Sequence, residues 1–327
     1  MANPLLSICI ATYNRADYIG ETLKSIVSQL EDDVELLVVD GASTDGTREV
    51  VEGFAKEDPR VRYVRLLEKG GVDHDYDQSV ELARGEFCWL FTDDDALKSG
   101  AIAAVKAAVK KGYDLVVVNA EERDRTLSEV LEGRRLFIRK DTVYEPSDTN
   151  RFFKDAAKHI SFIGAVVIRR AVWLERDRKS YFGTEFVHVG IIFQEKIKTP
   201  IFAVANPYIM IRLGNSQWTP RGFDIWMFKW PRLVWSFEGV SSEAKRNVVE
   251  REPWRKLRNL LIQRRIGGYD AQSYHLYISK LKIDRLFKLK AFAIAILPVW
   301  TIAPAFDILL RHRRRKRAHY IAALGNE

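Results

Sequence analysis

Short apolar runs rich in β-branched residues alternate with helical patterns from residue 5 to about residue 119. After the first run, apolar residues recur at the spacing of one helix face, at Ile19, Leu23, Ile26, Val27 and Leu30. This alternation is typical of βαβ units around a parallel sheet. The pattern predicts an α/β fold with strands at residues 6–11, 35–40, 61–66, 87–91 and 115–119.

The pattern becomes less regular after residue 120. It predicts strands at residues 160–168 and 201–211 and a helix from about residue 185 to residue 196. From Trp218 onward tryptophan and basic residues become frequent. The sequence therefore predicts two domains, residues 1–214 and residues 215–327.

Polar segments follow four of the predicted strands, at residues 12–15, 40–46, 70–73 and 92–95. In open α/β sheets the ligand crevice lies outside the carboxyl ends of the strands. We therefore expect these segments, which are far apart in the sequence, to meet at one edge of the sheet.

Three consecutive carboxylates, Asp93, Asp94 and Asp95, stand in the last of these segments. Neighbouring carboxylates repel one another unless a cation or hydrogen-bond donors lie among them. Their oxygens suit Mg²⁺ or Mn²⁺, which commonly complete their coordination shells with water and with substrate phosphate oxygens. The pattern favours a metal–diphosphate site, although aspartates at this position also form turns and cap helices.

Three motifs follow one another over about 115 residues. Residues 7–15 read Ser-Ile-Cys-Ile-Ala-Thr-Tyr-Asn-Arg, residues 38–47 contain Asp40 and Gly41, and residues 83–87 lead into the three aspartates. In this order they resemble the family-2 glycosyltransferases, which implies a GT-A fold, that is, a Rossmann-like domain with a mostly parallel sheet. Residues 70–73, 186–190 and 225–231 extend the resemblance to abequosyltransferase-like enzymes of bacterial surface polysaccharides. The sequence departs from many family members at Lys69, where they carry asparagine, and by lacking a later Ala-Arg-Asn.

The resemblance implies that the first domain binds a nucleotide-sugar donor and transfers its sugar with inversion of the anomeric centre. The donor-binding residues that it implies are Thr12, Tyr13, Asn14, Asp40, Ser43, Asp73, Asp93 and Asp94. It also implies a divalent metal cofactor, Mn²⁺ or Mg²⁺, with Asp93 and Asp95 as ligands and His188 as a further candidate ligand.

An inverting transfer needs a base that removes the proton of the acceptor hydroxyl. Family members place a carboxylate for this purpose at the start of a later helix, and Glu185 is the candidate here. A carboxylate in the first turn of a helix is also favourable with the helix dipole, so a structural role for Glu185 stays open. His188 is equally compatible with a metal ligand, an acceptor contact or a hydrogen-bonded core histidine.

The formal net charge of +8 indicates an anionic partner. The densest basic run, residues 311–317, directly follows an apolar segment at residues 291–306, and this adjacency favours a membrane over nucleic acid. Pro298 and Pro304 interrupt the apolar segment, so a re-entrant or interfacial hairpin is favoured over a crossing. Trp226, Trp230 and Trp235 lie among cations as at a headgroup layer, or in an amphipathic core helix.

These features predict a helical, membrane-associated C-terminal region and a peripheral or monotopic enzyme at the cytoplasmic face of a bacterial inner membrane. The expected partners are the nucleotide-sugar donor, a lipid-linked saccharide acceptor and anionic inner-membrane lipids, and nucleic acid is not expected. Cys9 and Cys88 sit in apolar runs as small buried residues, and the N-terminus lacks the pattern of a secretory signal, which fits a reducing cytoplasm.

Two other functions compete with this interpretation. A sugar-1-phosphate nucleotidyltransferase also holds phosphate with a metal on a doubly wound sheet, but it is expected to have a basic glycine-rich loop after the first strand, and residues 12–15 lack one. A non-catalytic basic membrane-binding protein would account for the net charge. It would leave the three aspartates unexplained.

Overall fold

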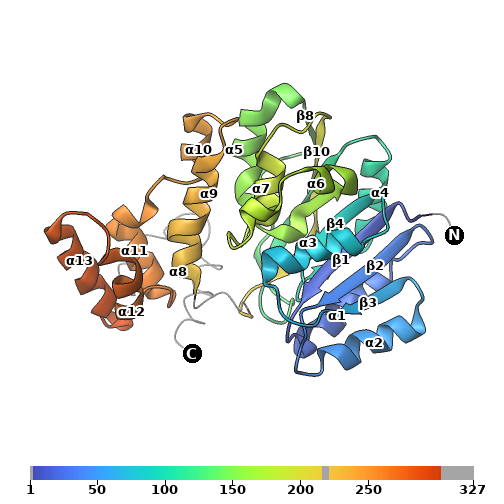
Figure 1. Ribbon diagram of the computed structural model, residues 1–327, viewed down its shortest axis with the longest axis horizontal. Coiled ribbons are helices and arrows are strands. Elements are labelled where there is room, and N and C mark those ends of the chain that lie inside the picture. Colours follow the sequence, from blue (N-terminus) through green and yellow to red (C-terminus); the bar gives the residue numbers. More distant parts are fainter. Residues whose placement is uncertain (1–2, 216–220, 303–327) are drawn as a thin grey trace. The chain divides into compact units, whose positions relative to one another are not determined.

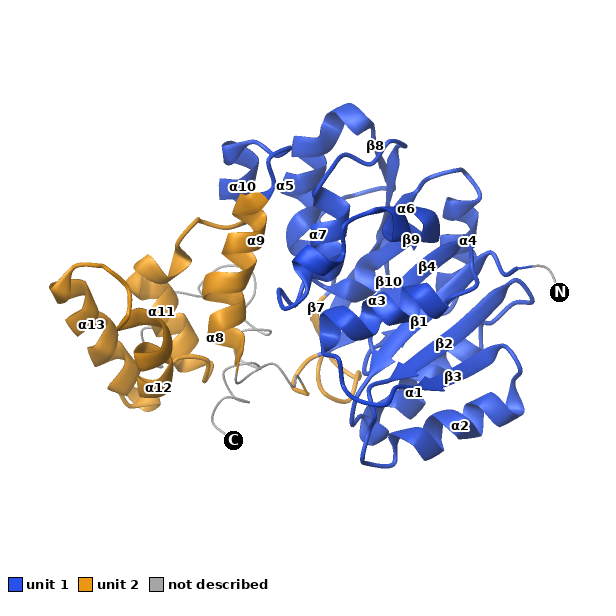
Figure 2. Ribbon diagram, in the orientation of Figure 1, with its two compact units in different colours: residues 1–122, 133–212, 237–248 blue, residues 123–132, 213–236, 249–327 orange. Residues whose placement is uncertain are grey.

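The computed structural model describes residues 3–215 and 221–302, which form two compact units (Figures 1 and 2). The first unit comprises Met1–Glu122, Gly133–Arg212 and Phe237–Val248, and the second comprises Arg123–Glu132, Leu213–Ser236 and Val249–Glu327. The predicted assignment of residues 1–214 to a catalytic domain and 215–327 to a membrane-associated region stays a prediction, because compactness alone assigns no function to either unit.

A central sheet organises the first unit. Four of its strands are parallel neighbours in the order β3 (Val61–Arg65), β2 (Val34–Asp40), β1 (Leu6–Thr12) and β4 (Phe87–Phe91). β2 and β4 are buried along their whole length. Strands covered on both faces are expected to be nearly continuous in apolar residues, as these are.

The sheet continues with β9 (Val166–Arg169), which pairs antiparallel with both β4 and β6 (Leu115–Arg123). β10 (Ile201–Arg212) pairs antiparallel with β5 (Ala96–Leu97) and with β8 (Thr142–Tyr144). The β10–β5 pairing holds the end of β10 beside the chain that follows β4. This pairing brings a distant segment to the three aspartates.

Helices of the first unit cover the sheet, with α3 (Val72–Leu82) lying against β1 and β2 (Figure 1). α1 (Ala16–Val27) buries Ile19, Leu23 and Ile26, as its apolar spacing predicted. The remaining helices are α2 (Thr47–Glu57), α4 (Ala101–Val109), α5 (Thr149–Ile160), α6 (Arg170–Glu175), α7 (Val187–Phe193) and α10 (Ser242–Val248), and short 3₁₀ turns span Pro146–Asp148, Ile163–Ala165 and Lys179–Tyr181.

The structure confirms the five strands predicted in the first 119 residues and the strand predicted at 201–211. The strand predicted at 160–168 is wrong in its first half, because Ile160 ends α5 and the backbone of Ser161 still hydrogen-bonds to Ala157. The helix predicted from residue 185 to residue 196 is shorter, and Glu185 lies before it with a φ of 70°.

The second unit contains β7 (Val130–Glu132), α8 (Gly222–Asp224), α9 (Trp230–Ser236), α11 (Leu257–Arg265), α12 (Ala271–Ser273) and α13 (Arg285–Ile296). π-helical turns span Ile225–Lys229 and Tyr274–Ile278, and a 3₁₀ turn spans Pro253–Arg255. Its core includes Phe223, Tyr269 and Ile294, with the Phe223 and Tyr269 rings stacked at 4.6 Å between centroids. No helix within the described ranges is long and apolar enough to cross a membrane. Trp218, the part of the apolar segment 291–306 that follows residue 302, and the basic run at 311–317 lie outside the described residues.

Candidate functional site

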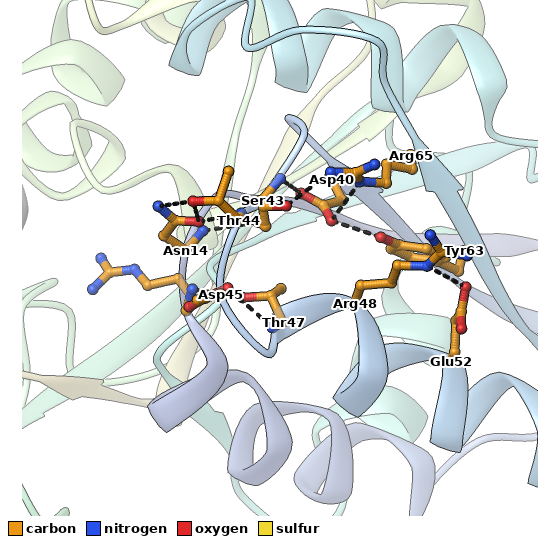
Figure 3. A network of polar contacts seen from close by, with 11 residues as sticks. Asn14, Asp40, Ser43, Thr44, Asp45, Thr47, Arg48, Glu52, Tyr63 and Arg65 are labelled. Atoms are coloured by element: carbon orange, nitrogen blue, oxygen red, sulfur yellow. Dashed lines mark hydrogen bonds and ion pairs between the residues drawn. The ribbon is translucent and has the colours of Figure 1, made fainter.

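The loops that follow β1 and β2 are joined by hydrogen bonds (Figure 3). The backbone N–H of Asn14 donates to Ser43 Oγ at 2.8 Å, and Asn14 Oδ1 accepts the backbone N–H of Thr44 at 2.8 Å. Gly41 N donates to Thr12 O at 2.9 Å. Asn14 adopts a φ of 53°, a region that asparagine tolerates better than most residues. The two predicted donor loops therefore form one connected surface.

Asp40 lies at the centre of this network with no exposed surface. Its Oδ1 accepts the N–H of Ser43 at 2.8 Å, and its Oδ2 accepts the hydroxyl of Tyr63 at 2.6 Å (Figure 3). Burial and then the Asp40 hydrogen bond raise the pKa of Tyr63, which keeps the phenol as a donor. Asp40 thus fixes the shape of the loop after β2, and its contact with the nucleotide stays a prediction.

Tyr13 extends the same surface. The Nζ of Lys69 lies 3.7 Å from the centroid of the Tyr13 ring, within the range of a cation–π contact. Lys69, at which this sequence departs from many family members, therefore contacts Tyr13, a residue predicted to bind the nucleotide-sugar donor.

The aspartates after β4 surround an arginine that follows β1. Arg15 Nε lies 3.3 Å from Asp93 Oδ1, and an Arg15 terminal nitrogen lies 3.2 Å from Asp94 Oδ2. Burial, followed by the charge of Asp94, raises the pKa of Asp93 to about 7, while Arg15 acts in the opposite direction. Positive charge at this position therefore favours the ionised form of these carboxylates.

Asp95 is more deeply held. Its Oδ1 accepts the backbone N–H of Arg212, at the end of β10, at 2.7 Å, and its Oδ2 accepts the hydroxyl of Thr92. The Arg212 side chain also donates to the carbonyl of Asp94 at 2.8 Å. Burial raises the pKa of Asp95 well above its usual range. Each carboxylate oxygen keeps one further lone pair after these bonds.

The chemistry of this site fits a hard divalent cation. Within the described residues, no group of three or more histidine, cysteine, aspartate and glutamate side chains is arranged to enclose a metal ion. Mg²⁺ and Mn²⁺ sites that serve phosphate substrates commonly use one or two carboxylates and leave the remaining positions to water and phosphate. Arg15 supplies positive charge to Asp93 and Asp94, which is the role such a cation would also fill.

Helix α3 connects the aspartates to the other loops. Tyr76 donates its hydroxyl to the carbonyl of Phe91, at the end of β4, at 2.8 Å. The preceding residue, Asp75, accepts the N–H of Gly70 at its Oδ1 at 3.1 Å. A Cβ at Gly41 would come within 3.1 Å of Asp75 Oδ2. The start of α3 therefore approaches the segments after β2, β3 and β4 together.

Asp73, in the first turn of α3, holds the segment that carries Glu185. Its Oδ2 accepts the N–H of Glu185 at 2.8 Å, and its Oδ1 accepts the N–H of Val187 at 2.9 Å. Glu185 has a φ of 70°, a left-handed backbone that is uncommon for residues other than glycine and needs such support. Glu185 therefore precedes α7 instead of lying in its first turn, and Asp73, predicted to bind donor, uses both oxygens on backbone groups.

His188 lies inside the first unit, 2% exposed, and its Nε2 donates to the carbonyl of Ile160 at 2.8 Å. Burial lowers its pKa to about 4. This contact is that of a hydrogen-bonded core histidine. The metal role of His188 stays a prediction, and the metal site proposed below does not include it.

The structure adds residues that the sequence analysis did not single out, namely Arg15, Tyr63, Tyr76 and Arg212. Arg15 stands in the first motif, in which the sequence analysis named Tyr13 and Asn14 as donor-binding residues. No local pattern in the sequence indicates Arg212, because its backbone N–H binds Asp95, which lies 117 positions away in the sequence.

A model of the family described as "Glycosyl transferase family 2" matches residues 7–176. This match covers more than half of the chain and the segments that follow β1, β2, β3 and β4, and it ends before Glu185. The chain belongs to glycosyl transferase family 2. Membership in this family favours the transferase interpretation over a nucleotidyltransferase or a non-catalytic binding protein.

Among curated relatives, this family 2 chain is 28% identical over 232 residues to "Abequosyltransferase RfbV" of Salmonella typhimurium strain LT2, which covers 67% of this chain and 69% of that protein. It is 33% identical over 135 residues to "GalNAc(5)-diNAcBac-PP-undecaprenol beta-1,3-glucosyltransferase" of Campylobacter jejuni, covering 41% of this chain and 44% of the relative. The second match thus spans less than half of that relative's length.

Solved structures share the fold of this family 2 chain. A fragment of S. aureus TarS in complex with UDP aligns with a TM-score of 0.56 at 16% identity over 94% of this chain and 93% of that one. The mannosyltransferase PcManGT from Pyrobaculum calidifontis, in complex with GDP-Man and Mn²⁺, aligns with a TM-score of 0.54 at 16% identity over 100% and 87%. The predicted GT-A fold with its mostly parallel central sheet is confirmed.

Proposed function

We propose that this family 2 chain is an inverting, divalent-metal-dependent glycosyltransferase of bacterial surface polysaccharide assembly, of the O-antigen or capsule type. Its substrates are a nucleotide sugar and a saccharide linked to a polyprenyl diphosphate. The observation that carries the proposal is the convergence of Asp93, Asp94 and Arg15 at the carboxyl ends of β1 and β4. Opposite charges held together at this edge suit a ligand that brings both a metal ion and a diphosphate.

The donor occupies the surface made by the loops after β1 and β2. Thr12, Tyr13 and Asn14 border the nucleotide, and Asp40 and Ser43 shape the loop that faces its base or ribose. Asp93 and Asp95 would hold Mn²⁺ or Mg²⁺, and Asp94 would contact the donor. Such an ion, when bound, stabilises the negative charge that develops on the departing diphosphate.

Glu185 acts on the acceptor. Its carboxylate takes the proton of the acceptor hydroxyl while that oxygen forms a bond to the anomeric carbon. The bond from this carbon to the diphosphate oxygen breaks with its electron pair on the diphosphate, so the configuration inverts. Asp73 keeps the Glu185 backbone in its left-handed conformation through the two N–H groups that it accepts. Asp73 is therefore a positioning residue.

The acceptor class is supported by a relative and by the apolar segment at 291–306 with the basic run at 311–317 that follows it. The Campylobacter jejuni relative is named for a GalNAc(5)-diNAcBac-PP-undecaprenol substrate. An acceptor with a polyprenyl tail is reached at a membrane surface. We therefore place the enzyme at the cytoplasmic face of the inner membrane, peripheral or monotopic, with residues 1–214 as the catalytic domain and residues 215–327 on the acceptor side near anionic lipids.

Thermal unfolding of the full-length chain tests the donor site. We expect one of UDP, GDP, dTDP and CDP to raise the melting temperature with Mn²⁺ and to lose this effect with chelator, because a ligand that binds only the native state stabilises it. Asp95→Ala should remove the metal-supported shift. No shift with any diphosphate would contradict the proposed donor site.

Transfer of labelled sugar to a lipid-linked acceptor tests the base. Glu185→Gln should keep the diphosphate-induced shift and lose transfer, since the amide cannot accept a proton. The matched control is Glu175→Gln on α6, which changes an exposed glutamate of the same unit. Normal turnover in Glu185→Gln would assign the base to another residue.

A further inference from the structure

The helix α13 has two apolar faces, and among the described residues one of these faces packs in the core of the second unit. Ala291, Ile294 and Ala295 are buried in that core, and the carbonyl of Ala291 accepts the hydroxyl of Tyr269 at 3.1 Å. These contacts turn this side of α13 toward the core of the second unit, in which α13 lies beside α11 and α12 (Figure 2).

The opposite face exposes large apolar side chains. Leu286 is 57% exposed, Leu289 65% and Ile296 54%, and Ala293 between them is also exposed. Their spacing of three, four and three residues places all four within an arc of about 80° on a helix with 3.6 residues per turn. Trp300, four residues further on and beyond the end of α13, is 78% exposed. We call Leu286, Leu289, Ala293 and Ile296 the α13 stripe.

Cations border the α13 stripe on both sides. At the same helical spacing, Arg285 falls about 20° outside one edge of the arc and Lys290 about 40° outside the other. Both side chains are exposed, and so is that of Lys282 before the helix. A row of apolar side chains between two cationic edges, with a tryptophan at one end, is typical of a helix that lies in the interfacial layer of a bilayer.

We propose that the α13 stripe docks on the surface of a bilayer that contains anionic lipids. Leu286, Leu289 and Ile296 enter the boundary between headgroups and acyl chains, while Arg285 and Lys290 contact lipid phosphates. The proposal deepens the proposed function, on which it rests for the lipid-linked acceptor, by naming the surface that meets the membrane.

The charges favour a lipid surface over a second copy of the chain. The three-four spacing of the stripe also suits a helix–helix seam. In such a seam the flanking positions normally pair opposite charges, whereas here both flanks are cationic and two copies would repel along the contact. Anionic headgroups complement both flanks at once.

Flotation of the full-length protein with vesicles tests the proposal. The probe vesicles contain two parts phosphatidylcholine to one part phosphatidylglycerol, with pure phosphatidylcholine as comparison. Leu289→Ser together with Ile296→Ser should weaken partitioning by at least about tenfold, because two large apolar side chains no longer leave water. The matched control is Leu276→Ser, which changes a leucine that is 49% exposed in the same unit but outside the stripe.

A charge reversal tests the cationic edges separately. Arg285→Glu with Lys290→Glu should reduce binding to the anionic vesicles by about tenfold at low salt and by much less at high salt. Lys56→Glu with Lys110→Glu, two exposed positions of the first unit, makes the same change of net charge and should leave binding unchanged.

Three outcomes would overturn the proposal. Vesicle binding that survives both the serine variant and the Arg285/Lys290 charge reversal but is lost in Arg313→Glu with Arg314→Glu would assign membrane binding to the terminal basic run. A wild-type dimer in sedimentation that the serine variants dissociate, without any change in flotation, would assign the stripe to a second copy. Equal binding of all variants and wild type would show that another surface binds. The diphosphate-induced thermal shift, measured on the same variants without vesicles, reports separately on the proposed donor site.

Discussion

Acidification should destabilise the first unit through His159. This histidine is 2% exposed on α5, and its Nε2 donates to the carbonyl of Val118 at 2.8 Å. Burial, with a smaller effect from Arg135, lowers its pKa from 6.5 to about 3. The folded state therefore keeps the ring neutral at pH values where the unfolded chain binds a proton.

The sign and size of this change in the free energy of unfolding follow from proton linkage. Because the pKa is lowered on folding, the contribution of His159 is complete above about pH 6.5 and is lost progressively as the pH falls toward about 3. One pKa unit corresponds to about 1.4 kcal/mol, so moving from about pH 7.5 to about pH 5.5 should remove about 1.3 kcal/mol through this residue alone.

Urea unfolding at the two pH values, followed by the fluorescence of the buried Trp89 and Trp173, measures this loss. His159→Gln cannot titrate, so its stability should fall by about 1.3 kcal/mol less than that of the wild type between the two pH values. The exposed His275→Gln should behave as the wild type. An equally steep acid dependence in His159→Gln would refute the reasoning.

Three further predictions concern close packing and the site. Gly85→Ala should lower the free energy of unfolding in urea by about 1–3 kcal/mol, since its Cβ would lie 2.5 Å from Ser7 N. Gly53→Ala in α2, with open space around it, should raise that free energy by about 0.5–1 kcal/mol. Equal effects of the two substitutions would contradict this reasoning. Tyr63→Phe should lower the free energy of unfolding by about 1–3 kcal/mol, because Asp40 loses the hydroxyl that donates to it at 2.6 Å. Tyr208→Phe is the control. An unchanged stability in Tyr63→Phe would show that the hydrogen bond to Asp40 adds nothing. Asp73→Asn should lower kcat in the transfer assay while the diphosphate-induced thermal shift persists, and an unchanged kcat would remove Asp73 from the positioning of Glu185.

The elements near the N-terminus could be predicted because their signals are local. β4 coincides with the predicted strand at 87–91, and α1 buries the apolar positions that its spacing indicated. The strand predicted at 160–168 failed because a continuous apolar run does not distinguish the buried end of a helix from a buried strand. There the contacts of Phe152, Phe153 and Ile160 inside the first unit decided for helix.

The roles of the acidic residues were less accessible. The sequence indicated Asp93, Asp94 and Asp95 as a group, because three adjacent carboxylates after an apolar strand are a local signal. It did not indicate that Asp73 holds backbone N–H groups more than 100 positions away. It also gave no sign of the left-handed backbone of Glu185, which depends on that contact.

The sequence by itself determined the order of strands and helices in the first half, the polar segments at the strand ends and the family resemblance, because apolar periodicity and short motifs are read over neighbouring residues. Tertiary structure alone decided which partners those segments meet. Arg15 and Asp94 are 79 positions apart, and Arg212 and Asp95 are 117 apart. Such pairs are set by which strands lie side by side in the sheet, and no local spacing encodes that order.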